Sequence, residues 1–119
     1  MTIRLNEAAL SHAHGLLRRG EFVADERDDW SEDCPSASEE TEFIERHGIA
    51  EYARWHLGED SSKTDGTKGR YSFPYGDLGR LHRCAVISGE SRAAQYHHAS
   101  IERAYRELLT AIDHKMKRD

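Results

Sequence analysis

Residues 100–116 have the sequence SIERAYRELLTAIDHKM, and this stretch decides the fold class because it holds the clearest helical pattern in the chain. Ser100 is a residue type that caps helix N-termini. Apolar residues then recur at the spacing of one helical face: Ile101, Ala104, Tyr105, Leu108, Ile112 and Met116. The pattern therefore predicts a helix over residues 101–116.

Two further helices are predicted nearer the N-terminus. Asn6 and Gly20 mark the ends of an apolar pattern over residues 7–19, because asparagine favours N-caps and glycine favours helix C-termini. Ser38 begins a second helix in the same way. Gly48 is placed to end that helix, after which the chain starts a new one.

The middle of the chain continues this pattern. A short helix is expected over residues 50–57, and Asp77 is placed to cap a long helix over residues 78–96. Pro74 excludes the residue before it from the helical region, so residues 71–75 are expected to be extended. The sequence thus predicts a mainly α fold, a bundle of four to five helices with an extended Phe-Pro-Tyr segment and an acidic loop.

The composition indicates one small and highly charged domain. The chain has 119 residues, 33% of them charged, and a mean hydropathy of -0.84, so residues 1–119 are treated as a single domain with one modest core. Residues 21–60 carry fourteen acidic and three basic side chains, a net charge of -11. We expect an acidic loop at residues 21–40, ordered or mobile, that repels nucleic acid or folds back over the basic C-terminal half. Residues 59–70 are expected to be a flexible connection.

Several classes of protein are disfavoured by simple features. No apolar run approaches the roughly 20 residues that a membrane span needs, so no membrane partner is expected. The N-terminus becomes polar before a signal-peptide core could form, and two cysteines cannot make a disulfide framework. We therefore expect a cytoplasmic protein, with its oligomeric state left open.

The densest group of ligand-binding residue types lies at residues 66–83, where basic and aromatic side chains alternate. Cations beside a helix N-terminus bind phosphate, and a tyrosine ring stacks on a base or another planar ring. The candidate residues for such an anion or ligand site are Lys68, Arg70, Tyr71, Tyr75, Arg80, His82, Arg83 and Arg92. The alternative is that the aromatic residues pack in the core and the cations are ordinary surface residues.

His82 and Arg92 fall on the apolar face of the predicted helix over residues 78–96. A buried guanidinium needs a carboxylate or an anion. Either Asp113 or an acidic residue of the 21–40 loop supplies it, or Arg92 and His82 form an anion pocket with the loop that carries Lys68.

Eight histidines raise the question of a metal site, but their spacing does not support one. His12 and His14 are two residues apart on a predicted helix and so point in different directions, and the same holds for His82 and Cys84. No residue is therefore assigned as a metal ligand and no cofactor is expected. Cys84 is interpreted as a small core residue.

Three stretches carry a family resemblance: YARWHLG from residue 52, TKGRYSFPYGD from residue 67, and SRAAQ from residue 91, with His82-Arg83 between the last two. Over residues 40–113 the chain resembles a family of small uncharacterised bacterial proteins. The resemblance implies a cytoplasmic helical domain and identifies no catalytic residue.

Three hypotheses of function follow. The first is a non-enzymatic helical domain that binds a protein partner through its acidic 21–60 region or the opposite basic rim. The second is binding of nucleic acid or of a phosphorylated ligand through the Lys68–Tyr75 loop and the start of the helix after it. The third is metal binding by histidines.

Overall fold

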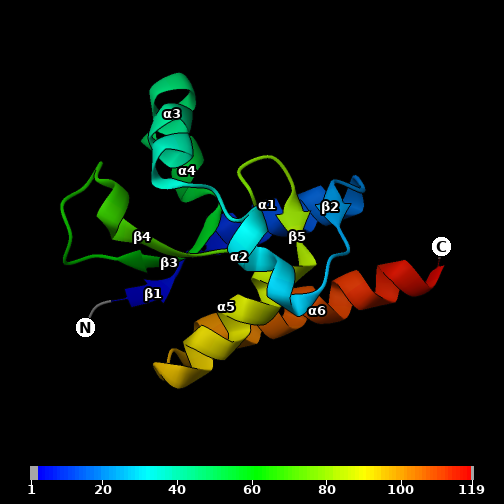
Figure 1. The fold of residues 1–119 in the computed structure, drawn as a ribbon. Coiled ribbons are helices and arrows are strands. Elements are labelled where there is room, and N and C mark those ends of the chain that lie inside the picture. The colour runs from blue at the N-terminus through cyan, green and yellow to red at the C-terminus, as the bar shows by residue number, and fades with distance from the viewer. Residues whose placement is uncertain (1–2, 119) are drawn as a thin grey trace.

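The computed structural model describes residues 3–118, and its two longest helices pack on each other along most of their length. They are α5 (Arg83–Gln95) and α6 (Ala99–Arg118), which lie side by side in Figure 1. Gly89 lies where they cross, and the Tyr105 ring occupies the space that a β-carbon at this position would need. α1 (Glu7–Arg18) packs against α6 as well.

The core lies between these helices and a small sheet. Its largest fully buried side chains are those of Tyr75, Tyr105, Leu57, Leu81, Ile101, Leu108 and Ile112. The described residues form six helices and two small sheets, with 61% of the chain in helices. The prediction of a mainly helical fold is therefore confirmed in part, whereas the predicted bundle of four to five helices is wrong in its number of helices and lacks the sheets. The Phe-Pro-Tyr segment packs against this core as expected, since Tyr75 is fully buried and Phe73 is partly buried.

The sequence did not predict the two small sheets. The first consists of β1 (Ile3–Leu5), β3 (His56–Asp60) and β4 (Tyr71–Pro74), antiparallel in the order β1-β3-β4. The second pairs β2 (Phe22–Val23) with β5 (Leu81–His82) in parallel. Such short strands carry too little periodicity to be recognised, and no tight turn links any two of them.

Two predicted helices begin or end at different residues. α5 starts at Arg83 rather than at Leu78. Leu78 has a positive φ of 69°, and the Asp77 carboxylate accepts hydrogen bonds from the two N–H groups that follow it, so this segment is a turn. The helix predicted over residues 50–57 is shortened to α4 (Ile49–Ala53), because the residues that follow it enter β3.

Other predictions are confirmed. Residues 71–74 form the strand β4 as predicted, although Phe73, the residue before Pro74, has a positive φ of 61°. α1 and α6 match the predicted helices within a few residues. α3 (Ala37–His47) ends at Gly48, which has a φ of 88° that suits glycine. Its N-cap is Ser36 rather than Ser38: the Ser36 hydroxyl accepts from the Glu39 N–H at 3.2 Å, and the Glu39 carboxylate accepts from the Ser36 N–H at 3.0 Å.

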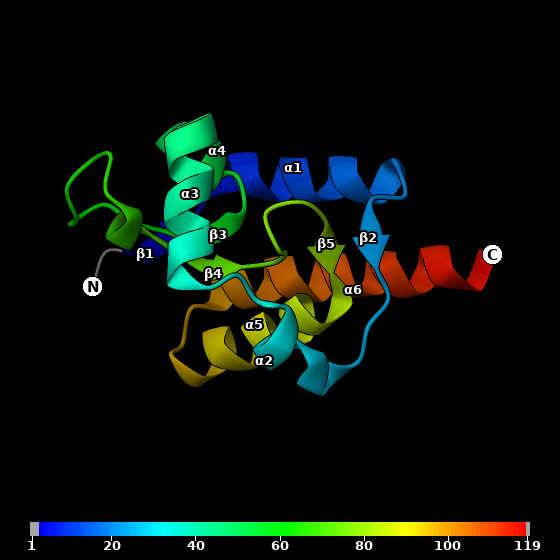
Figure 2. The same cartoon turned by 45° about the horizontal axis from the view of Figure 1, so that its top comes forward.

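The acidic segment at residues 21–40 contains regular structure, including η1 (Arg27–Asp29) and α2 (Trp30–Asp33). Both contact α5, and Figure 2 shows α2 in front of that helix. The segment therefore folds back over the C-terminal half, one of the two outcomes expected from its charge. The connection at residues 59–70 includes the end of β3 and the turn η2 (Lys68–Arg70).

The described residues form one globule with a radius of gyration of 13.5 Å. Within residues 3–118, every helix is too short or too polar to span a bilayer.

Candidate metal centre

Four side chains that commonly bind metals meet between the acidic segment and the start of α5. They are Asp25, Asp33, His82 and Cys84, which we call the ligand cluster. One ligand atom from each lies within 4.8 Å of the others. Asp25 Oδ2 is 2.7 Å from His82 Nδ1 and 3.0 Å from Cys84 Sγ. Asp33 Oδ2 lies slightly farther away, at 3.7 Å from the same nitrogen and 3.9 Å from the same sulfur.

The local fold explains why Asp25 reaches this place. β2 pairs with β5 so that Val23 lies opposite His82, and Asp25 follows two residues later. The Asp25 carboxylate then accepts the Cys84 N–H at 2.8 Å, one of the N–H groups that an α-helix leaves unpaired at its N-terminus. Asp25 thus caps α5 from a separate segment, and the helix dipole favours its charge there.

A further carboxylate orients the histidine from the other side. Asp77 Oδ2 lies 2.8 Å from His82 Nε2, while Asp77 Oδ1 accepts the backbone N–H groups of Gly79 and Arg80. In metal sites a ligating histidine commonly donates its second ring N–H to a carboxylate in this way. The arrangement leaves Nδ1 of His82 facing the ligand cluster.

The protonation states of the cluster are strongly coupled. Burial alone would raise the pKa of Asp25, but hydrogen bonds from Cys84 and His82 outweigh it and lower the pKa to about 2. Burial alone would lower the pKa of His82, but its bonds to Asp25 and Asp77 raise it above the ordinary 6.5. The two carboxylates therefore favour the cationic form of His82.

The pKa values of the other two groups are raised as well. Burial, followed by the Asp25 carboxylate, raises the pKa of the Cys84 thiol well above its usual range. A hydrogen bond to Asp25 raises the pKa of Asp33. Two carboxyl groups that meet in this way repel each other unless a proton or a cation lies between them. A divalent cation can replace several of these protons at once.

The four side chains of the ligand cluster differ in how far they are exposed to solvent. Cys84 is fully buried, and the side chains of His82 and Asp25 are 7% and 9% exposed. Asp33 is the outer member, with a side chain 38% exposed. An ion at this place would be held by an inner group of three ligands and closed from solvent by the fourth.

Three of the basic residues that the sequence placed in an anion site are paired within the chain. Lys68 forms an ion pair with Glu40 at 3.1 Å, and Arg70 forms one with Glu59 at 2.9 Å. Arg83 bonds to Asp113 at 2.9 Å and so takes the partner that was considered for Arg92. Their charges are therefore largely neutralised.

The aromatic candidates have different surroundings. Tyr75 is fully buried, and its hydroxyl donates to the Arg54 carbonyl at 2.6 Å, so this conformation does not offer its ring to a ligand. Tyr71 is half-buried and its ring contacts Tyr52. Arg80 is exposed, and among the described residues its side chain has no hydrogen-bond or ion-pair partner.

The prediction that Arg92 is buried on an apolar helix face is wrong. Because α5 begins at Arg83, its buried face consists of Cys84, Ala85, Val86, Gly89 and Ala93. Arg92 is exposed and, within residues 3–118, makes no hydrogen bond or ion pair. It lines a separate pocket described below.

Sequence reasoning dismissed His82 and Cys84 because residues two apart diverge on a helix. In the structure His82 ends β5 with an extended backbone, at φ -118° and ψ 126°, and Cys84 lies in the first turn of α5. The two side chains can therefore face one point. A histidine two residues before a cysteine at a strand-to-helix boundary was the signal available; nothing local identified Asp25 or Asp33.

No protein-family model matches this chain, no curated protein matches it, and no solved structure matches it. The resemblance to small bacterial proteins stays a prediction. Side-chain geometry is therefore what supports a function.

Proposed function

We propose that this protein is a zinc-binding domain in which the ligand cluster holds one structural Zn²⁺ ion. The observation that carries the proposal is the convergence of one nitrogen, one sulfur and two carboxylate oxygens within 4.8 Å, from three parts of the chain: Asp25, Asp33 and the β5–α5 junction. Sulfur, imidazole and carboxylate are the ligand types that zinc accepts together, whereas magnesium and calcium take oxygen ligands.

The distances suit this ion. Zinc bonds of about 2.0 Å to nitrogen or oxygen and about 2.3 Å to sulfur place tetrahedral ligand atoms roughly 3.3 to 3.8 Å apart. The contacts from Asp33, at 3.7 and 3.9 Å, are close to this spacing. Asp25 and His82, at 2.7 Å, need to separate by roughly 0.6 Å when zinc replaces the proton between them.

Four protein ligands are typical of a structural zinc site, since catalytic sites usually leave one position for water. Such an ion would tie the acidic segment to the start of α5. Asp77 is also consistent with a structural zinc site, because its carboxylate would accept a hydrogen bond from His82 Nε2 and so hold the ring with Nδ1 toward the ion.

The test is metal binding by the full chain, purified without a histidine tag. We expect one zinc per chain by elemental analysis after dialysis. Cobalt substitution should give a thiolate-to-metal charge-transfer band, which Cys84→Ser abolishes while lowering zinc affinity roughly 100-fold. Cys34→Ser is the matched control, because Cys34 is the other free cysteine and lies exposed.

Two acidic variants refine the test. Asp77→Asn should weaken zinc binding about tenfold through the orientation of His82, whereas Asp28→Asn, an exposed aspartate nearby, should not change it. A chain that binds no zinc or cobalt, or a Cys84→Ser variant that keeps the charge-transfer band, would refute the proposal.

A further inference from the structure

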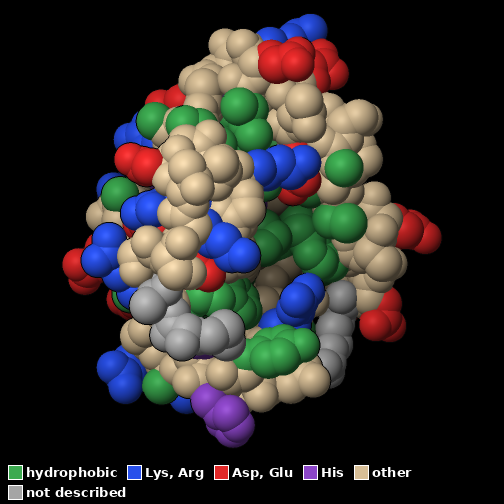
Figure 3. Space-filling model, turned by 90° about the vertical axis from the view of Figure 1, so that its left-hand side faces the viewer, with side chains coloured by type: hydrophobic (Ala, Val, Ile, Leu, Met, Phe, Trp, Pro, Cys, Tyr) green, Lys and Arg blue, Asp and Glu red, His purple; other side chains and the backbone are tan. Residues whose placement is uncertain are grey.

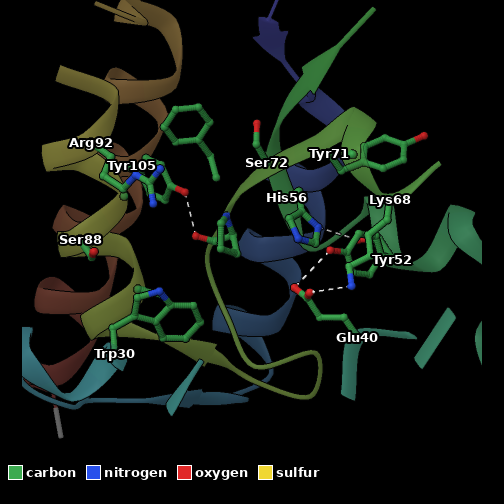
Figure 4. A pocket seen from close by; sticks show the side chains of 15 residues that line it. Trp30, Glu40, Tyr52, His56, Lys68, Tyr71, Ser72, Ser88, Arg92 and Tyr105 are labelled. Atoms are coloured by element: carbon green, nitrogen blue, oxygen red, sulfur yellow. Dashed lines mark hydrogen bonds and ion pairs between the residues drawn. The ribbon is translucent and has the colours of Figure 1, made fainter. Parts of the chain in front are cut away.

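A second feature of the molecule lies on the other side of Trp30: a cavity of about 520 Å³ between β4, α5 and the start of α3. We call it the Arg92 pocket. Trp30, Arg92 and Ser88 line one side, and Glu40, Tyr52 and His56 line the other (Figure 4). Figure 3 shows that the face carrying β3 and β4 is hollowed, with hydrophobic side chains in the hollow and Lys or Arg side chains beside it.

The walls of the Arg92 pocket are mostly flat and apolar. The aromatic rings come from Trp30, Tyr52, Tyr71, Phe73 and Tyr105, and Pro74 adds another flat surface. The Tyr105 hydroxyl is satisfied by the Pro74 carbonyl at 2.7 Å, so this residue presents ring surface rather than a polar group. A cavity of this size with such walls suits a small molecule with a planar ring.

One positive charge in the pocket is free. Lys68 is neutralised by Glu40 at 3.1 Å, and the Tyr52 hydroxyl donates to the same carboxylate at 3.2 Å. Arg92, on the opposite wall beside Tyr105, has no ion-pair partner among the described residues. Its planar guanidinium presents paired N–H donors that match a carboxylate or another oxyanion.

Two polar atoms on the pocket wall also lack a protein partner. The Ser72 hydroxyl oxygen is buried and makes no hydrogen bond. His56 Nδ1 lies 2.8 Å from the Tyr52 carbonyl and donates to it, which leaves Nε2 as an acceptor without a partner among residues 3–118. A buried hydroxyl is rarely left unpaired, so Ser72 marks a place on the pocket wall where a ligand can make a hydrogen bond.

We propose that the Arg92 pocket binds a small planar aromatic molecule that carries one oxyanion group. The oxyanion pairs with Arg92, the ring lies between the aromatic walls, and a donor group on the ring reaches His56 Nε2. A nucleic-acid chain fits less well, because Arg70 and Arg83 are paired with Glu59 and Asp113.

The proposal is tested with two fluorescent probes of similar shape. 8-Anilinonaphthalene-1-sulfonate carries a flat naphthalene ring, an anilino ring and an anionic sulfonate, and N-phenyl-1-naphthylamine has the same rings without the charge. We expect saturable binding of the anionic probe at one site per chain. Arg92→Gln should weaken it about tenfold and leave the neutral probe within about twofold. The matched control is Arg103→Gln, since Arg103 is exposed on α6 and has no ion pair among the described residues.

A pocket-filling variant locates the probe. Ser88→Phe places a ring in the cavity and should abolish binding of both probes, with folding checked by circular dichroism. Equal affinity of Arg92→Gln and wild type for the anionic probe would overturn the proposal, even if Ser88→Phe fails to fold. Cys84→Ser removes a zinc ligand and changes no residue that lines the pocket, so failure of one proposal does not entail failure of the other.

Discussion

His56 and His82 are the two buried histidines of the described chain, and their surroundings are opposite. His56 is 3% exposed on the floor of the Arg92 pocket, where its polar partner is a backbone carbonyl. His82 is 5% exposed at the ligand cluster, between the carboxylates of Asp25 and Asp77. Burial lowers the pKa of His56 to about 4, whereas the two carboxylates raise that of His82.

The comparison shows that burial alone does not decide what a histidine does. Burial keeps His56 neutral against the opposing effect of its hydrogen bond to the Tyr52 carbonyl, and one nitrogen is available to accept a hydrogen bond from a ligand. Carboxylate partners make the site of His82 attractive to any cation, whether a proton or a metal ion. The two histidines therefore suit two different kinds of ligand. Both sites adjoin α2, because its Trp30 ring contacts His82 and also lines the pocket.

The largest expected effect concerns His56 and acid. Its folded pKa of about 4 lies below the unfolded 6.5, so the stability tied to the neutral ring is present above pH 6.5 and is lost as pH falls toward 4. Relative to His56→Gln, which cannot titrate, wild type should lose about 2 to 3 kcal/mol of unfolding free energy between pH 7 and pH 4.5. Urea denaturation at several pH values measures this.

The control for this prediction is His114→Gln, because His114 is exposed on α6. Its stability curve should run parallel to that of wild type. If the His56→Gln curve is parallel to wild type as well, the ring is not held neutral and the two histidines do not differ as described.

A smaller effect is expected in the pH dependence of ligand binding. Zinc must displace the Cys84 proton, whose pKa burial and Asp25 raise, so zinc affinity should rise at least tenfold for each pH unit between 6 and 7. The anionic probe meets a permanently charged Arg92 and a neutral His56, so its affinity should change less than about twofold there. Titrations at pH 6 and 7 compare the two. A zinc affinity independent of pH would show that the thiol is not a ligand.

Much of the fold follows from local patterns. The apolar stripe of α6, the N-cap of α1 at Asn6 and the extended segment before Pro74 depend on residues close together in the sequence, and the sequence predicted each of them. The sheets depend on distant pairings: Ile3 pairs with Asp60, and Phe22 with Leu81. Strands of two to five residues give no periodic signal from which such pairings can be recognised.

The candidate site was less predictable for the same reason. Asp25 and His82 meet because β2 pairs with β5, and that pairing places His82 on a strand instead of inside a helix. Because α5 starts at Arg83 and not at Leu78, His82 lies outside the helix, and the side chains of His82 and Cys84 need not point in different directions. The sequence singled out Arg92 as a buried cation in need of a partner, but Arg92 is exposed and has no ion pair among the described residues, while Asp113 pairs with Arg83.

The smallest expected effect is coupling between the two sites through α2. This helix has four residues, none of them buried, so its position depends on the contacts of its side chains. Asp33 at its end belongs to the ligand cluster, and Trp30 at its start lines the Arg92 pocket. Zinc bound to Asp33 should hold α2 against α5 and thereby fix one wall of the pocket.

We therefore expect zinc to tighten binding of the anionic probe about threefold, and the probe to tighten zinc binding by the same factor, since coupling between two sites is reciprocal. Asp33→Asn should remove most of this coupling. The other three ligands should still bind zinc in this variant, but with lower affinity than wild type. Glu32→Gln, a neighbouring exposed side chain on α2, is the matched control and should retain it. Probe titrations with zinc and with a chelator measure the factor. If the coupling factor is unchanged in Asp33→Asn, zinc does not act on the pocket through Asp33 and α2. The two sites would then be coupled through α5 instead.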